Sequence, residues 1–313
     1  MSVLSCPEVC DWEVFGPTDG GAPRVLLEVP HGATRTAHFE ILRRRLESDL
    51  PADLADFFHV NTDVGAPELA RAVAARVATE TGGRVAVLRC LVPRTLVDCN
   101  RALDQGVDGL TPGLPDYVDR PADRRLLSDL HRRYLEAAEA AYAEVCGAGG
   151  LAVTLHTYAP RSVDVGAVDG SIVQVLRRAY APEVYERWPP RPEVDLITRD
   201  ENDDLIAPAE LVEAVKRGYL EAGVGVAENE TYRLFEATTG HWHSIRWPNR
   251  VLCLEVRRDL LADPFDPFVE MRIGAAKVER MAAPLARALA AQTTTDPLSA
   301  PPPLAAAEAP CPT

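Results

Sequence analysis

The sequence lacks the features that mark membrane proteins and nucleic-acid-binding proteins. No apolar run approaches the ~20 residues that a membrane-spanning helix needs, and residues 1–6 have neither the basic start nor the apolar stretch of a signal peptide. Basic residues are also scarce, because 33 Lys and Arg stand against 47 Asp and Glu, for a formal net charge of -14. Nucleic acids and anionic membrane surfaces favour clustered Lys and Arg. We therefore expect a cytoplasmic protein whose partner is neither a nucleic acid nor a membrane.

Paired cysteines and the common catalytic motifs are missing as well. The seven cysteines are odd in number and scattered without a C-x-x-C pair, which argues against a disulfide framework or a thiolate zinc site and predicts reduced thiols. The chain has no H-E-x-x-H, no G-x-S-x-G, no Walker loop and no dinucleotide-binding glycine fingerprint. A serine hydrolase, a kinase and a dehydrogenase therefore have no support in the sequence.

The composition and the pattern of apolar residues predict a globular α/β protein. Hydrophobic residues make up 47% and charged residues 26% of the 313 residues, which is ordinary for a globular chain. Apolar runs bounded by turn residues predict strands at 24–30, 84–90, 151–156, 171–176 and 250–256. Apolar residues at helical spacing predict helices at 67–81, 123–146, 208–222 and 268–291. This alternation predicts a three-layer α/β sandwich with a mixed, largely parallel sheet.

We expect a single catalytic domain over residues 1–292, followed by a disordered tail over 293–313 that is rich in Pro and Ala. The segment 106–122 is rich in Gly, Pro and Asp, and it is either a lid or a plain surface loop. In sheets of this type, ligands gather at the carboxyl ends of the strands. The candidate site residues all lie at or just beyond such ends or after an apolar run.

Two histidines and one aspartate suggest a metal site. His31 directly follows the predicted strand 24–30, His156 ends the predicted strand 151–156, and Asp63 follows an apolar run. One strand-end histidine alone is more often a hydrogen-bonded structural residue. Two neutral imidazoles and one carboxylate, however, form a catalytic zinc set that leaves a fourth position for water. We therefore predict that His31, Asp63 and His156 bind Zn²⁺.

Two arginines shortly after the predicted strand 84–90 in the sequence suggest a carboxylate-binding site. Arg94 and Arg101 follow this strand, and Asn100 stands beside Arg101. An arginine fork binds a carboxylate through two parallel hydrogen bonds, and a neighbouring amide can add a third. The alternative is a surface ion pair between Asp98 and one of the arginines.

Glu255 lies within an apolar strand sequence, where an unpaired charge is costly. Such a glutamate must be paired, protonated or close to a metal. Beside an activated water it would serve as general base and then as general acid. The alternative is a salt bridge with Arg257 or Arg258.

His241 and His243 form a further imidazole pair just before the last predicted strand. Histidines two residues apart face opposite ways on an extended chain, so we expect at most one of them to face the site. That one would hold the substrate or stabilise an oxyanion. The alternative for both is a solvent-facing loop histidine.

Taken in order, these segments resemble the N-formylglutamate amidohydrolase family, zinc hydrolases whose fold is related to that of the zinc carboxypeptidases. The likeness spans about residues 24 to 280 and rests on the order of several short motifs. The matching motifs are Pro30-His31-Gly32, Thr62-Asp63, Arg94, Asp98-Cys99-Asn100-Arg101, His156, Asn229-Glu230-Thr231-Tyr232 and Leu254-Glu255-Val256-Arg257-Arg258.

The resemblance implies zinc ligation by His31, Asp63 and His156, with Glu255 as the base and Arg101 as the clamp on a substrate carboxylate. The chain departs from the family pattern in two places. Thr154 stands where the family usually has an aspartate, so other groups must orient His156. The segment 233–236 replaces a glycine-rich stretch that helps form the family's substrate pocket.

The sequence thus predicts a zinc-dependent hydrolase that cleaves the amide of a small carboxylate-bearing substrate, either an N-acyl amino acid or a peptide-like compound. Two alternatives stay open: a metal-free protein of the same fold that binds a small acidic ligand, and a carboxypeptidase-like peptidase. The sequence does not indicate an oligomeric state.

Overall fold

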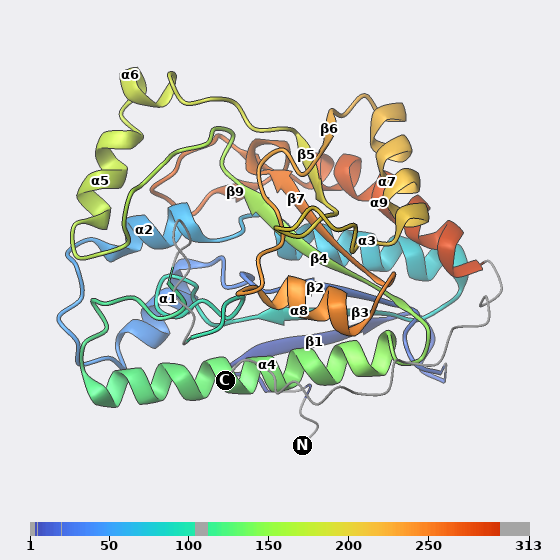
Figure 1. Cartoon of the computed structure of the whole chain (residues 1–313), viewed down its shortest axis with the longest axis horizontal. Helices are drawn as coiled ribbons and strands as arrows, with labels where there is room; N and C mark the ends of the chain where they lie inside the picture. The colour runs from blue at the N-terminus through green and yellow to red at the C-terminus, as the bar shows by residue number, and fades with distance from the viewer. Residues whose placement is uncertain (1–3, 5, 20, 104–111, 295–313) are drawn as a thin grey trace.

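A seven-stranded sheet forms the centre of the computed structural model, which describes residues 4, 6–19, 21–103 and 112–294 (Figure 1). Its strands are β1 (Cys10–Phe15), β2 (Val25–Val29), β3 (Val85–Cys90), β4 (Leu151–Tyr158), β5 (Val194–Ile197), β6 (Val226–Glu228) and β7 (Val251–Arg257). They lie in the order β1-β3-β2-β4-β7-β5-β6. β3, β2, β4 and β7 run parallel, whereas β1 pairs antiparallel with β3 and β5 pairs antiparallel with β7. The predicted mixed, largely parallel sheet is confirmed.

Helices cover both faces of this sheet and complete the predicted three-layer sandwich. One face packs against α3 (Ala66–Thr81), α7 (Ala209–Glu221) and α9 (Ala275–Thr294). The other face packs against α4 (Pro121–Val145) and α8 (Thr239–Arg246). The shorter helices α1 (Thr36–Arg43), α2 (Leu54–Asn61), α5 (Ile172–Ala179) and α6 (Pro182–Tyr185) lie on the side toward which the parallel strands run (Figure 1). A 3-10 turn, η1 (Arg258–Leu260), leads from β7 to a small sheet of β8 (Ala262–Asp263) and β9 (Arg272–Ile273).

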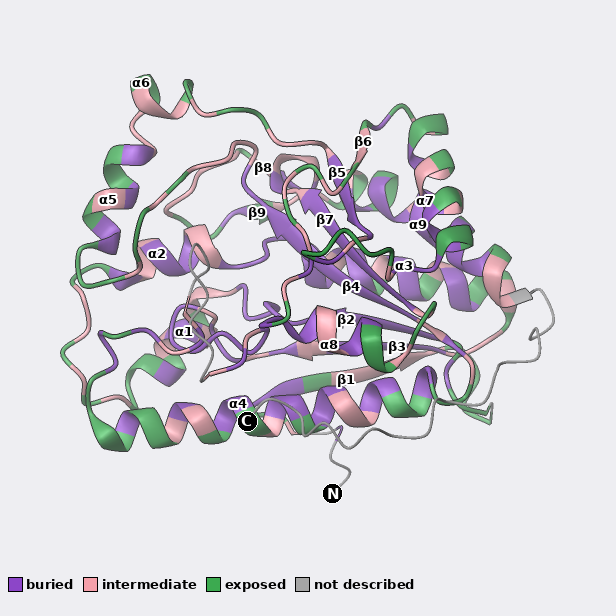
Figure 2. Ribbon diagram, in the orientation of Figure 1, coloured by how far each residue is buried: buried purple, intermediate pink, exposed green. Residues whose placement is uncertain are grey.

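The central strands are apolar at most positions because both of their faces are covered. In β2, Leu26 joins the core cluster beneath α4, whereas Leu27 and Val29 join the cluster beneath α3, α7 and α9. Neighbouring residues of a strand point to opposite faces, so a strand covered on both sides needs apolar residues at nearly every position. Full burial of each such leucine contributes about 1.5–3 kcal/mol. Figure 2 shows the buried residues concentrated in the strands and on the inner sides of the long helices.

Two of the predicted elements are wrong in type or extent. The segment 171–176 forms helix α5, not a strand, because its buried residues Ile172, Val173, Leu176 and Ala179 follow a helical spacing that continues past the expected end. The helix predicted at 268–291 begins only at Ala275, and β9 occupies part of the segment before it. The strands β1, β5 and β6 were not predicted. β1 is an edge strand whose side chains are mostly half-exposed, so it lacks a continuous apolar signal.

The tail expected at 293–313 lies outside the described residues from 295 onward, and α9 runs through Thr294. Within the expected loop 106–122, residues 106–111 lie outside the described part of the chain, and α4 begins at Pro121. The six described cysteines are all free. Among the described residues, no helix is both long and apolar enough to span a membrane.

Candidate metal centre

The fold brings His31, Asp63 and His156 together from three separate segments. β2 and β4 are parallel neighbours with Leu27 opposite Val153, so His31, just beyond β2, meets His156 near the end of β4. Asp63 comes from the short connection between α2 and α3. The Thr62 hydroxyl fixes this connection by donating to the carbonyl of Ala33 at 2.9 Å. The apolar run before Asp63 forms helix α2. Asp63 follows this helix and lies beside His31 and His156 at the ends of the strands.

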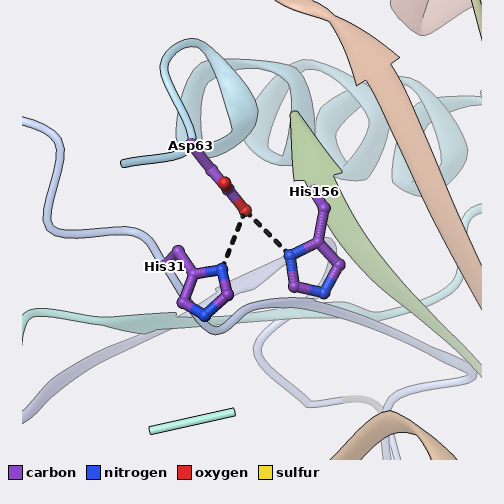
Figure 3. A group of neighbouring side chains, drawn as sticks. All are labelled: His31, Asp63 and His156. Carbon is purple, nitrogen blue, oxygen red and sulfur yellow. Dashed lines mark hydrogen bonds and ion pairs between the residues drawn. The ribbon is translucent and has the colours of Figure 1, made fainter. Parts of the chain in front are cut away.

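The three side chains place one potential metal ligand atom each within 4.8 Å of the others (Figure 3). Asp63 Oδ2 lies 2.8 Å from Nδ1 of His156 and 3.3 Å from Nδ1 of His31. All three residues are buried, with exposed fractions of 2%, 2% and 8% for His31, Asp63 and His156. His31 Nδ1 has no hydrogen-bond partner in the described part of the chain, because the contact with Asp63 lacks hydrogen-bond geometry. A buried nitrogen without a partner is costly, and a metal ion would satisfy it.

The local charges suit a cation at this position. Burial by itself would raise the pKa of Asp63, but His31 and His156 beside it hold that pKa below the ordinary value. Asp63 is therefore ionised, which is the form that a metal ion would require of its carboxylate. Two imidazole nitrogens and one carboxylate oxygen match the donor set of a catalytic zinc site.

Asp98 holds the far edge of the His31 ring. The His31 Nε2 and Asp98 Oδ1 atoms lie 2.8 Å apart, and Asp98 is fully buried. Burial opposes its ionisation, but Arg94, His31 and Arg101 lower the pKa of Asp98 well below its ordinary value. The sequence indicated Asp98 only as the partner of an arginine, because nothing in its spacing reveals that His31 packs against it.

The ion pair considered as the alternative for the arginine cluster is present in the structure. Arg94 Nε lies 2.9 Å from Asp98 Oδ2, and Arg101 Nε lies 3.8 Å from the same oxygen. The pairing does not bury the arginines completely, since 19% of the Arg94 side chain and 12% of the Arg101 side chain are exposed. Arg101 Nε makes no hydrogen bond to any described residue. One carboxylate thus faces two guanidinium groups.

Asn100 is oriented by its own loop and by the start of α8. Its backbone N–H donates to Asp98 Oδ1 at 2.9 Å, and its side-chain oxygen accepts a hydrogen bond of 2.5 Å from the Thr239 hydroxyl. The loop that carries Arg101 is therefore fastened to α8.

Glu255 lies beside the metal-ligand group. On β7 it is the register partner of His156 on β4, and it is 9% exposed. Burial raises its pKa to about 7 against the opposing effects of His156, Arg191 and Arg94, with Asp63 adding to the rise. Its Oε2 atom has no hydrogen-bond partner among the described residues.

The two arginines considered as alternative partners for Glu255 are engaged elsewhere. Arg257 pairs with Asp259 at 2.8 Å. Arg258 donates to the carbonyl oxygens of Val60 at 2.6 Å and Thr157 at 3.3 Å. These two carbonyls belong to the segments that carry Asp63 and His156, so Arg258 links the two segments.

His241 and His243 lie on helix α8, so the expectation of an extended chain there is wrong. The Thr238 side chain caps this helix by accepting from the backbone N–H of His241. The His243 ring is buried and stacks on Tyr142 with 3.7 Å between ring centroids and 8° between planes, and burial lowers its pKa to about 3. His241 Nε2 lies 4.0 Å from Asp200 Oδ2.

Two groups near the site escaped the sequence analysis. Glu28, on β2, is buried and accepts hydrogen bonds from the hydroxyls of Tyr134 at 2.9 Å and Tyr142 at 2.7 Å, and Tyr142 also contacts Thr154. Glu28, like Glu255, is a carboxylate inside an apolar strand sequence, so the reasoning applied to Glu255 could have found it. Arg191 precedes β5, a strand that was not predicted, and its contacts are described below.

One family model and two solved structures are similar to most of this chain. The family model of N-formylglutamate amidohydrolase matches residues 24–262. An N-formylglutamate amidohydrolase structure from Ralstonia eutropha JMP134 is similar over 90% of this chain and 96% of its own, with 19% identity and a TM-score of 0.54. A gene product of Agrobacterium tumefaciens is similar over 90% of this chain and 94% of its own, with 19% identity and a TM-score of 0.50. A search of curated proteins found no match. Because the family model covers most of the sequence, the chain belongs to the N-formylglutamate amidohydrolase family.

Proposed function

We propose that this protein is a zinc-dependent amidohydrolase that cleaves the linear amide of an N-acyl amino acid resembling N-formylglutamate. The observation that carries the proposal is the buried group of His31, Asp63 and His156, whose ligand atoms lie within 4.8 Å of one another beside the partnerless carboxylate oxygen of Glu255. Membership of an amidohydrolase family supports the reaction class.

The residues fit a zinc ion once the 2.8 Å hydrogen bond between His156 Nδ1 and Asp63 Oδ2 is replaced by bonds from both atoms to the metal. His31 Nδ1, Asp63 Oδ2 and His156 Nδ1 would hold it, while Asp98 engages the other nitrogen of His31 at 2.8 Å. A proton on Nε2 of His31, donated to Asp98, leaves the lone pair on Nδ1 for the metal. When bound, zinc supplies the acidity that activates a water molecule and polarises the amide carbonyl.

Glu255 would move the protons of the reaction. Its ionised carboxylate accepts a proton from the attacking water, and the resulting carboxylic acid then donates that proton to the leaving amine nitrogen. The new C–O bond and the broken C–N bond yield a carboxylic acid and a free amine. A pKa raised to about 7 suits a group that must both take and give a proton near neutral pH.

Arg101 would bind the carboxylate of the substrate. Asp98 already engages Arg94 at 2.9 Å, whereas Arg101 is 3.8 Å from the same oxygen and keeps hydrogen-bonding capacity. A guanidinium group held by its loop offers a planar pair of donors that a lysine cannot reproduce. Arg94, which faces the same Asp98 oxygen as Arg101, would assist in binding this substrate carboxylate.

The direct test is hydrolysis by protein that has been stripped of metal and then reloaded with zinc. N-formyl-L-glutamate, other N-acyl amino acids and short peptides serve as substrates, and release of the free amine is measured. We expect hydrolysis of N-acyl amino acids that disappears on chelation and returns with zinc. Cleavage confined to peptide C-termini would favour a carboxypeptidase-like enzyme, and binding without hydrolysis in zinc-loaded protein would favour a ligand-binding protein.

A further inference from the structure

Among the described residues, no carboxylate contacts the guanidinium group of Arg191 directly. Arg191 is half-buried, in the segment between α6 and β5. Its guanidinium group donates hydrogen bonds of 3.1 Å to the hydroxyls of Ser162 and Tyr232. In the described part of the chain, no Asp or Glu oxygen lies within 4.0 Å of its nitrogens. Arg161, in the same region, is instead paired with Glu186 at 2.6 Å.

Two tyrosines hold this guanidinium group in place. Its central carbon lies 4.9 Å from the ring centre of Tyr158 and 5.6 Å from that of Tyr232. Such cation–π contacts stabilise the charge and restrict its rotation. The backbone is fixed as well, because Arg191 N–H donates to the Pro160 carbonyl at 2.9 Å. Arg191 thus holds a positive charge at a defined position, with no counter-ion from the part of the chain that the structure describes.

This position borders the candidate metal centre. Tyr158 is two residues after His156 on β4, and residues two apart in a strand point to the same face. Arg191, like Arg94, opposes the rise that burial causes in the pKa of Glu255, the register partner of His156. The Tyr232 hydroxyl accepts a hydrogen bond from Arg191, so a residue of the family motif 229–232 contacts this arginine.

The count of charges around the site leaves room for two anions. Asp98 makes its close contact with Arg94, which leaves Arg101 and Arg191 without a carboxylate closer than 3.8 Å in the described residues. A substrate with one carboxylate on Arg101 would leave Arg191 uncompensated. A second acidic group would neutralise it through a charge-assisted, bidentate contact.

We propose that Arg191 is a specificity-determining residue that binds the side-chain carboxylate of an N-acylated acidic amino acid. This inference rests on the proposed function, because it assumes that the α-carboxylate of the same substrate lies on Arg101. Among the other motif arginines, Arg94 pairs with Asp98 and Arg257 with Asp259. Arg258 donates to the carbonyl oxygens of Val60 and Thr157.

The test compares N-formyl-L-glutamate with N-formyl-L-glutamine, which has the same shape but an uncharged side chain. For the unaltered enzyme we expect kcat/KM to favour the glutamate compound. Arg191→Met should lower kcat/KM for N-formyl-L-glutamate by roughly 10- to 150-fold, the scale of a lost charge-assisted hydrogen bond, while changing the glutamine value little. For N-formyl-L-glutamate, kcat/KM of Arg191→Lys should lie between the values of the parent and of Arg191→Met, because lysine keeps the charge but lacks the paired donors of a guanidinium group. Arg161→Met, which removes an arginine near Tyr185 that already has a counter-ion, is the matched control and should keep the preference.

A binding measurement separates this inference from the proposed function. Calorimetric titration of both compounds into Glu255→Gln protein, with and without zinc, requires no turnover. Loss of the glutamate preference in the Arg191→Met, Glu255→Gln double variant supports the inference even if the enzyme hydrolyses neither compound. Equal losses for both compounds, an unchanged preference, or the absence of binding by either compound would overturn it.

Discussion

His31 and Asp98 share a contact of 2.8 Å between Nε2 and Oδ1, on the edge of the ring that faces away from Asp63. The two residues lie 67 positions apart in the chain. The pair leaves Nδ1 of His31 as the ring atom available to a metal, and it anchors the loop that carries Arg94 and Arg101 to the same histidine. The proposed metal ligands and the proposed carboxylate clamp are therefore connected through one buried aspartate.

The first prediction concerns this pair. Asp98→Asn keeps the shape but removes the charge that orients and polarises His31, so zinc affinity should fall by about 10- to 100-fold. Competition with a chromophoric chelator measures the affinity, and circular dichroism checks the fold. Asp129→Asn, which alters an exposed pair with Arg132, should leave zinc affinity unchanged. Equal affinities in all three proteins would show that Asp98 serves only the arginine loop.

The second prediction concerns the proton-transfer group. Glu255→Gln should retain zinc and substrate binding, while kcat falls by about 10² or more because an amide cannot accept the proton. Steady-state kinetics and zinc content provide the two measurements. Glu228→Gln, on the exposed strand β6, is the control and should behave as the parent. Turnover of Glu255→Gln at the parent rate would require a different base.

The third prediction concerns the buried carboxyl of Glu28. Burial raises its pKa from the ordinary 4.5, although hydrogen bonds from Tyr142 and Tyr134 oppose the rise. The folded protein therefore holds this proton more tightly than the unfolded chain does, so its contribution to stability falls as pH rises above about 4.5.

Glu28→Gln removes this titration while keeping an oxygen that can accept a hydrogen bond. The free energy of unfolding of the parent, relative to that of the variant, should decrease between pH 5 and pH 8, by at most about 1.4 kcal/mol per pH unit. Urea unfolding of both proteins at each pH gives the difference. A difference that is independent of pH would mean that Glu28 ionises at its ordinary pKa despite its burial.

The sequence predicted the parts of this protein that depend on local pattern. The buried parallel strands are continuous apolar runs, so β2, β3, β4 and β7 and the histidines at the ends of β2 and β4 could be located from the sequence. The helices α3, α4 and α7 were found because each buries a single apolar stripe. Short or exposed elements gave weaker signals. α5 was mistaken for a strand because six residues rich in apolar side chains fit both the helical and the strand periodicity.

What the sequence could not supply are contacts between distant segments. That Asp98 would bind His31, and that Arg258 would link the segments of Asp63 and His156, depends on how loops pack above the sheet. Arg191 carries no motif, since its environment is made by Tyr158 and Tyr232 from two other segments. His243 was placed on an extended segment because the cap by Thr238 that starts α8 was not recognised.

The most direct test of the proposed zinc site is the zinc content of the purified chain and of its His31→Ala and His156→Ala variants. Each histidine would supply one of three protein ligands. His38→Ala is the matched control, because His38 is half-exposed and its ring accepts a hydrogen bond from the backbone of Arg35. We expect about one zinc ion per chain in the parent and in the control. The two ligand variants should stay folded but lose most of their zinc and activity. Full zinc content in both ligand variants would contradict the proposed zinc site.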